Sequence, residues 1–273
     1  MVVDKINAWL TSQEKSLEDG MQWIYQQEYA QLSGWAFRRQ FLMQRKESNG
    51  DLRFSSSGKC VRALAYAFHQ METEGKEVDS RGMRTFFMGD MTEIMIVLLA
   101  KISGVPIFGY GLQQPRIKLT IGDKEIFGHP DGFVVDEGEI LLVEVKSMND
   151  KGYDRFEKGT IDEGHIFQMN ANMEAAGVNR AVYVAFNKNT SVLGERVVHK
   201  DPDIVSLLRN NLYSVLCSTP DSLPERPFQP NEKGTLPWQC LYCAHHKTCW
   251  PAAQKVLVKN AYQLIVPKEV CAK

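Results

Sequence analysis

The chain has 273 residues, which is enough for one large domain or for a domain with an additional lobe. Its hydrophobic content of 44% and charged content of 24% are ordinary for a globular protein. No apolar run approaches the ~20 residues that a membrane span needs. The first ten residues lack the basic-then-apolar pattern of a signal peptide, so we expect a cytoplasmic location. The net charge of −1 excludes a global basic field, and contacts with nucleic acid would need local Lys and Arg patches.

The N-terminal segment, residues 4–47, is rich in aromatic residues and is predicted to be helical, with breaks at its glycines. Arg38 and Arg39 begin a basic run next to Trp35. Such a group could contact a phosphate backbone and stack a base on the indole ring. The pattern favours the alternative, an amphipathic helix with aromatic residues in the core and a solvated basic face.

Two further helices are predicted before the first strands. The run S-S-S-G over residues 55–58 offers an N-cap for a helix whose first turn contains Cys60, where the helix dipole favours a thiolate. A second helix, over about 83–102, carries Glu93 within a strongly apolar segment. A lone acid of this kind is usually a charge on the exposed face of a helix, whereas a buried one needs a cation.

The segment over residues 128–147, GHPDGFVVDEGEILLVEVKS, has the pattern of a β-hairpin. Two apolar, β-branched runs flank a turn at Glu137-Gly138. With that turn, Asp131 lies directly opposite Glu144. Lys146 follows Glu144 by two residues, so both side chains point to the same face as Asp131. The hairpin is therefore expected to bring two carboxylates and an ammonium together.

Two adjacent carboxylates repel each other, and their burial without partners is costly. A hard divalent cation with oxygen ligands removes this penalty, and it keeps waters that a phosphate group can replace. The alternative is a solvated face on which Lys146 pairs with the two acids. The apolar residues around the acids favour the metal site, because they place the carboxylates in a half-buried position.

A helix over about 162–176 carries His165, Gln168 and Asn172 at spacings of three and four, so these polar side chains share one face. Apolar residues occupy the other side of this helix, and the polar face is therefore predicted to border a site. The strands predicted over 117–121 and 125–135 are expected to form a three-stranded antiparallel meander with the strand that ends at Lys146. The other predicted elements are strands over 117–121 and 125–135, a polar loop over 149–159, strands over 181–186 and 192–199, and a helix over 204–216.

Near the C-terminus the chain contains the cysteine pattern C-x2-C-x5-C. In a reducing compartment, clustered cysteines are more often metal ligands than disulfides. Three thiolates are one short of a four-ligand site, and Cys60 is the expected fourth, although His245 or His246 could instead complete a zinc site. Cys217 lies on an apolar helical stripe and is expected to be buried. The predicted cluster ligands are Cys60, Cys240, Cys243 and Cys249.

Together these motifs resemble the signature of the RecB-type branch of the PD-(D/E)XK nucleases. G-D-M-T-E over residues 89–93 matches G-x-x-x-H/E, Pro130-Asp131 matches PD, and Glu144-Val145-Lys146 matches E-x-K. Q-M-N-A-N over residues 168–172 matches Q-x-x-x-Y, except that Asn172 stands where Tyr is usual. The split cysteine set is similar to that of the iron–sulfur members, which include the RecB-like exonucleases of CRISPR adaptation, the AddB nuclease domain and viral relatives.

The resemblance implies an α/β fold, a restriction-endonuclease-like core with a central mixed sheet flanked by helices. This core would span residues 57–217, after an N-terminal helical region over 1–56. A Pro-rich linker and cysteine lobe over 218–273 would close back on Cys60. The implied function is metal-dependent hydrolysis of DNA, by an exonuclease of recombination, repair, or CRISPR or viral DNA processing in a bacterium, archaeon or virus. A recombination or CRISPR-adaptation protein would be a possible partner.

The resemblance also implies residue roles. Glu93, Asp131, Glu144 and the Val145 carbonyl would hold one or two Mg²⁺ or Mn²⁺ ions, and Lys146 would orient the attacking water. Gln168 would position Lys146 or a DNA phosphate. The four cysteines would hold a 4Fe-4S cluster, or zinc in the alternative case. Other functions left open are a catalytically silent DNA-binding adaptor and a zinc-stapled endonuclease. The possible DNA contacts are His165, Asn172, Arg38 and Arg39.

Overall fold

The computed structural model describes the whole chain except residues 13–16, 18, 44–49, 72–78 and 268–273. Its internal contacts divide the chain into two compact units. The first unit comprises Met1–Arg45, Arg53–Gly58 and Val78–Leu208. The second comprises Lys46–Leu52, Lys59–Glu77 and Arg209–Lys273. The division at residues 56 and 217 that the sequence suggested stays a prediction.

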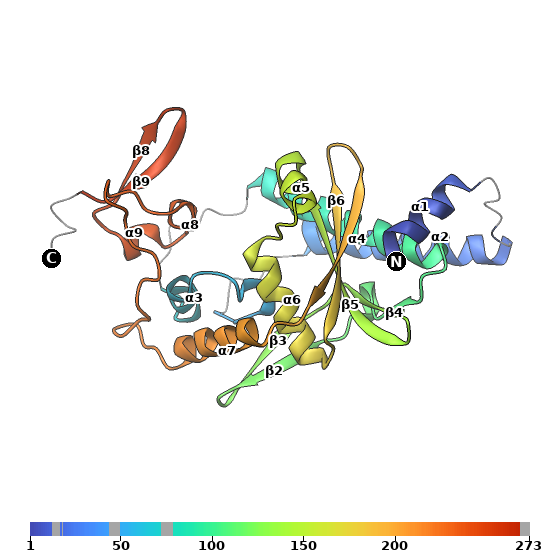
Figure 1. Ribbon diagram of the computed structural model, residues 1–273, viewed down its shortest axis with the longest axis horizontal. Coiled ribbons are helices and arrows are strands. Elements are labelled where there is room, and N and C mark those ends of the chain that lie inside the picture. The colour runs from blue at the N-terminus through green and yellow to red at the C-terminus, as the bar shows by residue number, and fades with distance from the viewer. Residues whose placement is uncertain (13–16, 18, 44–49, 72–78, 268–273) are drawn as a thin grey trace. The chain divides into compact units, whose positions relative to one another are not determined.

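The first unit is built on a five-stranded mixed sheet with the strand order β1-β4-β5-β6-β7 (Figure 1). The central pair, β5 and β6, is parallel, and the other neighbouring strands pair antiparallel. The strands are β1 (Ile107–Phe108), β4 (Gly132–Asp136), β5 (Glu139–Met148), β6 (Arg180–Asn187) and β7 (Leu193–His199).

Helices cover both faces of this sheet. On one face, Leu141, Val143 and Val145 of β5 pack in a core with α1 (Val2–Thr11), α2 (Asp19–Phe37) and α4 (Ser80–Ile102). On the other face, Leu142 and Tyr183 pack with α5 (Asp150–Glu157) and α6 (Glu163–Ala176). Strands buried on both sides read as continuous apolar runs, as β5 does. The prediction of an α/β core with a central mixed sheet flanked by helices is confirmed.

The β4–β5 hairpin has the predicted turn and register. Glu137 and Gly138 both have positive φ angles, 50° and 82°, which is the backbone of a two-residue type I′ turn. Gly132 pairs with Val143, so the next position along the ladder sets Asp131 opposite Glu144. The short turn therefore fixes the two acids next to each other.

The predicted meander is wrong. β2 (Ile117–Ile121) and β3 (Lys124–Gly128) form a separate two-stranded sheet, and β1 occupies the place beside β4. The strand predicted over 125–135 is interrupted because Pro130 lacks a backbone N–H and restricts the conformation of the residue before it. The chain therefore leaves one sheet at Gly128 and enters the next at Gly132.

Two helical predictions also need correction. The helix α1 ends at Thr11 and α2 begins at Asp19, next to Gly20, but Gly34 does not break the helix: it lies inside α2, which continues as a π-helical turn, η1 (Arg38–Leu42). A glycine inside a helix costs about 1 kcal/mol relative to Ala, which the packing of α2 outweighs. The polar loop predicted over 149–159 contains α5, because Asn149 caps it through Gly152 N–H at 3.0 Å and its apolar side is buried.

The second unit contains α3 (Val61–Phe68) and two one-turn helices, α8 (Trp238–Leu241) and α9 (His246–Cys249). The hairpin of β8 (Gln254–Val258) and β9 (Ala261–Ile265) completes it and was not predicted (Figure 1). Its described cores are small. The residues of α7 (Pro202–Leu216) are divided between the two units at Leu208. No helix in the described ranges combines the length and apolar composition needed to cross a membrane.

Candidate active site

The β4–β5 hairpin brings together three of the predicted site residues. Asp131 immediately precedes β4, and its Oδ2 accepts a hydrogen bond from the Val145 N–H at 2.7 Å. On β5, Lys146 and Glu144 form an ion pair. The Glu144 side chain is fully buried, with 0% exposed, whereas that of Lys146 is 24% exposed. Glu144 is therefore shielded from solvent, whereas part of the Lys146 side chain reaches it.

Glu93 reaches the same group from α4. Its Oε1 accepts a hydrogen bond from Gln114 Nε2 at 2.7 Å. Burial raises the pKa of Glu93 well above its ordinary value, and the negative charges of Asp131 and Asp90 raise it further. Such an effect requires the carboxylates to be close to one another. The structure thus gathers Glu93, Asp131 and Glu144, which are far apart in the sequence.

The pKa values of the three acids are all raised, because the nearby positive charges do not compensate for burial and mutual repulsion. Burial raises the pKa of Asp131, against the opposing effects of Lys146 and the Val145 N–H. Burial and the charge of Asp131 raise the pKa of Glu144 to about 7. Burial lowers the pKa of Lys146, but Glu144 and Asp131 outweigh it, so that the net shift is upward. A cation among the carboxylates would reverse their shifts.

The donor atoms fit a hard divalent cation. The Glu144 carboxylate is buried; its Oε1 is paired with Lys146, and its Oε2 has no hydrogen-bond partner. Three carboxylates form the oxygen-only ligand set that Mg²⁺ or Mn²⁺ prefers. In the described part of the chain, no three His, Cys, Asp or Glu side chains are already arranged to hold a metal ion. The carboxylates would therefore have to close around the ion on binding.

α6 places His165 beside Tyr183 of β6. His165 Nδ1 lies 2.9 Å from the Tyr183 hydroxyl, and Tyr183 pairs with Glu144 across β5 and β6. Burial, followed by the positive charge of Lys146, lowers the pKa of His165 to about 4. Gln168 is half-buried one turn later, and its amide makes no hydrogen bond to any residue that the structure describes. Its predicted role in positioning Lys146 stays a prediction.

Asn172 lies apart from these residues. It is 1% exposed, and its amide nitrogen and oxygen have no hydrogen-bond partner. A Cβ atom at Gly128 would lie 2.6 Å from Asn172 Oδ1 and 2.1 Å from a ring atom of Phe54, so only glycine fits there. Asn172 therefore packs in the core, and its predicted DNA contact has no exposed atoms to make it.

The two neighbouring arginines, both predicted DNA contacts, differ in position. Arg39 forms an ion pair with Asp90, and its guanidinium carbon lies 4.4 Å from the centroid of the Trp35 ring. Gln40 Nε2 donates to the second oxygen of Asp90 at 2.8 Å. Arg38 is exposed and takes no part in this network. Only Arg39 is thus held near Glu93.

Sequence reasoning missed three residues of this region. Asp90 lies three positions before Glu93 on one predicted helix, and this spacing could have placed the two acids on one face. Tyr183 joins the site through the parallel register of β5 and β6, and Gln114 through a loop after β1, η3 (Gly111–Gln113). Neither of these long-range placements leaves a signal in the sequence.

The second unit brings the four predicted cysteines into electrostatic range of one another. Cys60 is the N-cap of α3, and the others lie in or beside α8 and α9. Burial raises the pKa of Cys240 to about 11, and Cys60, Cys249 and Cys243 contribute to the rise. All four are free thiols. Cys217 is exposed, contrary to expectation, because it follows the last residue of α7.

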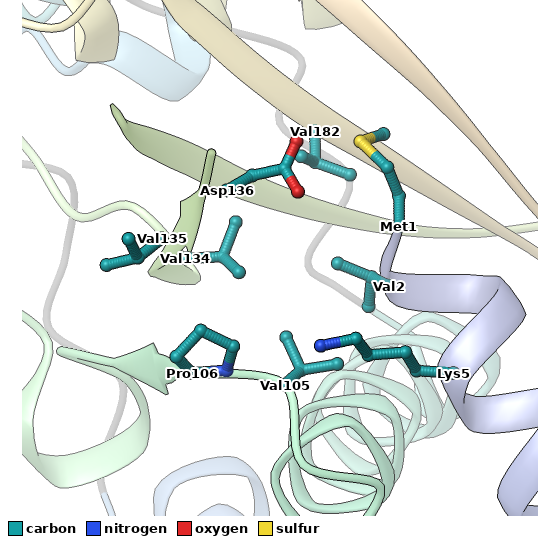
Figure 2. A pocket seen from close by; sticks show the side chains of 9 residues that line it. All are labelled: Met1, Val2, Lys5, Val105, Pro106, Val134, Val135, Asp136 and Val182. Carbon is teal, nitrogen blue, oxygen red and sulfur yellow. The ribbon is translucent and has the colours of Figure 1, made fainter. Parts of the chain in front are cut away.

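A separate hollow of about 60 Å³ lies elsewhere in the first unit (Figure 2). Val105, Val134 and Val182 contribute to its largely apolar lining, with Lys5 and Asp136 as its charged side chains. It contains none of the predicted catalytic residues. A second hollow, lined in part by Asp90 and Glu93, adjoins the carboxylates.

No protein-family model matches the chain, and no curated protein matches it. Among solved structures, the chain is similar to SSO0001, with 12% identity, a TM-score of 0.48, and coverage of 79% of this chain and 93% of the other. It is also similar to the alkaline exonuclease LHK-Exo from Laribacter hongkongensis, with 15% identity, a TM-score of 0.42, and coverage of 62% and 87%. For LHK-Exo in complex with dAMP the values are 17%, 0.45, 61% and 86%. At these TM-scores the likeness assigns no role to any residue.

Proposed function

We propose that this protein is a metal-dependent DNA nuclease of the PD-(D/E)XK, RecB type, and an exonuclease that hydrolyses phosphodiester bonds from DNA ends. The observation that carries the proposal is the fully buried carboxylate of Glu144, which lies beside Asp131, pairs with Lys146 through Oε1 and has no partner for Oε2. Burying carboxylates in this way is costly. Groups with perturbed pKa values that converge at a strand end favour a functional site over a structural ion pair.

The side chains of Glu93, Asp131 and Glu144, with the Val145 carbonyl, would hold one or two Mg²⁺ or Mn²⁺ ions. A bound ion supplies a water of lowered pKa and neutralises charge on the phosphate. The protein orients two of the carboxylates itself, because Asp131 accepts from the Val145 N–H and Glu93 accepts from Gln114. These hydrogen bonds leave the remaining oxygen lone pairs for the ion.

Lys146 would act on the reacting atoms directly. Its raised pKa keeps the ammonium charged at neutral pH, and the ion pair with Glu144 fixes its position. The ammonium then donates to the attacking water or to a phosphoryl oxygen on which negative charge accumulates. Gln168 would position Lys146 or a DNA phosphate. His165 stays neutral at pH 7, because its pKa is about 4, and it therefore adds no competing positive charge.

In the second unit, Cys60, Cys240, Cys243 and Cys249 would hold a 4Fe-4S cluster with a structural role, and zinc is the alternative. Their mutual proximity supports a shared ligand. Linking Cys60 to the C-terminal cysteines closes a very long loop of the chain, which reduces the conformational entropy of the unfolded state. Iron, sulfide and zinc analysis of protein purified without oxygen separates the two possibilities.

The test is digestion of end-labelled linear DNA and of closed circular DNA with Mg²⁺, with Mn²⁺ and with a chelator. We expect metal-dependent digestion of linear DNA, and a rate reduced by about 10³-fold in Lys146→Ala. Lys151→Ala, which removes an exposed lysine of α5, is the matched control and should keep the wild-type rate. Cleavage by Lys146→Ala at the wild-type rate would reject the mechanism. DNA binding without any cleavage by the wild type would instead identify the silent adaptor.

A further inference from the structure

A small hollow opens beside Glu93. It measures about 20 Å³, which is room for a water-sized group. Trp35, Arg39, Asp90 and Gln114 contribute to its lining, together with Glu93 itself. Because Glu93 belongs to both places, a group bound in the hollow would be a direct neighbour of a phosphate at the proposed metal site.

Arg39 is held in one orientation at this hollow. Asp90 pairs with its guanidinium, and Gln40 fixes Asp90 by donating to its other oxygen at 2.8 Å. The Trp35 ring lies against the guanidinium at 4.4 Å, within cation–π distance. The Asp90 side chain is 14% exposed and that of Arg39 is 43% exposed. A largely buried acid thus orients a partly exposed arginine, whose five N–H donors exceed what Asp90 can use.

Arg39 lies close to the acids, because it pairs with Asp90 and lines the same hollow as Glu93. Lys146 pairs with Glu144 on β5. The acids therefore lie within range of an ammonium from β5 and a guanidinium from η1. A DNA backbone that passes over the acids would contact both Lys146 and Arg39. An adjacent base would then contact Trp35, which is 36% exposed.

We propose that Trp35, Arg39 and Asp90 form a subsite for a single-stranded nucleotide next to the metal centre. The Arg39 guanidinium binds the phosphate adjacent to the scissile one, as a planar fork suits phosphate oxygens. The Trp35 ring stacks on the neighbouring base, and Asp90 is a positioning residue for Arg39. This inference rests on the proposed function and specifies its substrate, because both faces of a base inside a duplex are already stacked on its neighbours, whereas a single-stranded base has a free face for the Trp35 ring.

Binding of labelled oligonucleotides to metal-free protein, followed by fluorescence anisotropy, tests the subsite without cleavage. Trp35→Ala and Arg39→Ala should each weaken binding of single-stranded DNA about tenfold. Trp35→Phe should keep most of the affinity, and Arg39→Lys should fall between Arg39→Ala and the wild type. Arg155→Ala removes an exposed arginine of α5 as the matched control, and it should change the affinity by no more than about twofold.

Two readouts separate recognition from folding. Each DNA phosphate is replaced in turn by a neutral methylphosphonate. At one position this replacement should weaken binding to the wild type but should leave binding to Arg39→Ala unchanged, because that variant has already lost the contact. In cleavage assays, Asp90→Asn should raise KM more than it lowers kcat, as expected of a residue that positions Arg39 for binding. Thermal unfolding of each variant shows whether it is folded.

The outcomes distinguish this inference from the proposed function. If the wild type digests DNA while folded Trp35→Ala and Arg39→Ala bind it with wild-type affinity, the subsite is overturned and the nuclease stands. Equal weakening of duplex and single-stranded binding in Trp35→Ala overturns the stacking of a single-stranded base. If the wild type neither binds nor digests DNA with Mg²⁺, the nuclease and the subsite fail together.

Discussion

The carboxylate site of the first unit and the cysteine group of the second differ in what supports them. Asp131, Glu144 and Lys146 belong to a hairpin in a five-stranded sheet that has a hydrophobic core on each face. The cysteines lie at the start of α3 and around two four-residue helices. Helices of that length are not stable on their own. The core beneath them contains Leu236, Cys240, Leu264 and Val266.

This difference indicates which site depends on its metal for folding. The sheet holds three carboxylates together against their repulsion, so we expect the first unit to fold without an ion. In the second unit the pKa of Cys240 is raised to about 11, and the metal-free cysteine is therefore a neutral thiol. A metal or cluster would displace its proton and connect α3, α8 and α9. We therefore expect the second unit to need its ligand.

The largest effect should follow from Cys240→Ser. Structural zinc sites bind with roughly 10–16 kcal/mol of apparent free energy, which becomes folding free energy. We expect this variant to lose the bound iron or zinc and to expose residues 209–267 to protease. Cys217→Ser, which changes an exposed cysteine, should leave both properties unchanged. Full metal content and protease resistance in Cys240→Ser would show that the two units do not differ in this way.

The carboxylate site should respond to metal by a smaller amount. An ion that binds only the folded state adds about 2.7 kcal/mol at one hundred times its Kd. Thermal unfolding with and without Mg²⁺ or Mn²⁺ measures this gain, and Glu144→Gln should abolish it. Asp123→Asn, at a side chain that is 86% exposed, is the control and should keep the gain. A gain that persists in Glu144→Gln would place the ion elsewhere.

The sequence was sufficient wherever the geometry of the site is local. A two-residue turn fixes the hairpin register, so the pairing of Asp131 with Glu144 and the shared face of Lys146 could be predicted. The same local reasoning extended a strand through Pro130 and joined two sheets that the structure separates. The short strand β1, which actually borders β4, has two residues and no periodicity to detect.

Residues that enter the site through tertiary packing could not be predicted in this way. Tyr183 depends on how β6 aligns with β5, and a parallel crossover leaves that register open. Asn172 was expected on the polar face of its helix, but η2 (Phe54–Ser56) and β3 cover it. A helix buried on several sides loses the simple division into polar and apolar faces.

Beside the carboxylates, His165 offers a test of the first unit that needs no metal. Burial lowers the pKa of His165 in the folded state to about 4, compared with its ordinary value of 6.5. As the pH falls from 6.5 toward 4, the unfolded state therefore takes up a proton first, and the folded state loses stability relative to it. The loss should be on the order of 2 kcal/mol. Unfolding free energies of wild type and His165→Gln across this range measure it as a difference in slope. His199→Gln, at an exposed histidine of β7, should keep the wild-type slope. Parallel curves for wild type and His165→Gln would contradict the assignment.

The smallest effect concerns Asn172, whose amide nitrogen and oxygen are buried in the first unit without hydrogen-bond partners. The buried Glu144 belongs to the proposed metal site, whereas Asn172 lies outside it. Replacing such a group by an apolar one of similar size removes an uncompensated desolvation cost. Asn172→Leu should therefore raise the unfolding free energy by about 1 kcal/mol, which shifts Tm by roughly 2–4 °C.

Asn170→Leu, two residues away on α6, is the matched control. Asn170 is also buried, but its amide donates to the Ile166 carbonyl at 2.9 Å and accepts from the Asp201 N–H at 2.7 Å. Its replacement leaves these partners unsatisfied and should destabilise the protein by about 1–3 kcal/mol. If the unfolding free energy rises in Asn172→Leu and falls in Asn170→Leu, Asn172 serves only to fill space in the core. A stability loss in Asn172→Leu together with weaker DNA binding would instead return it to the site that the sequence predicted.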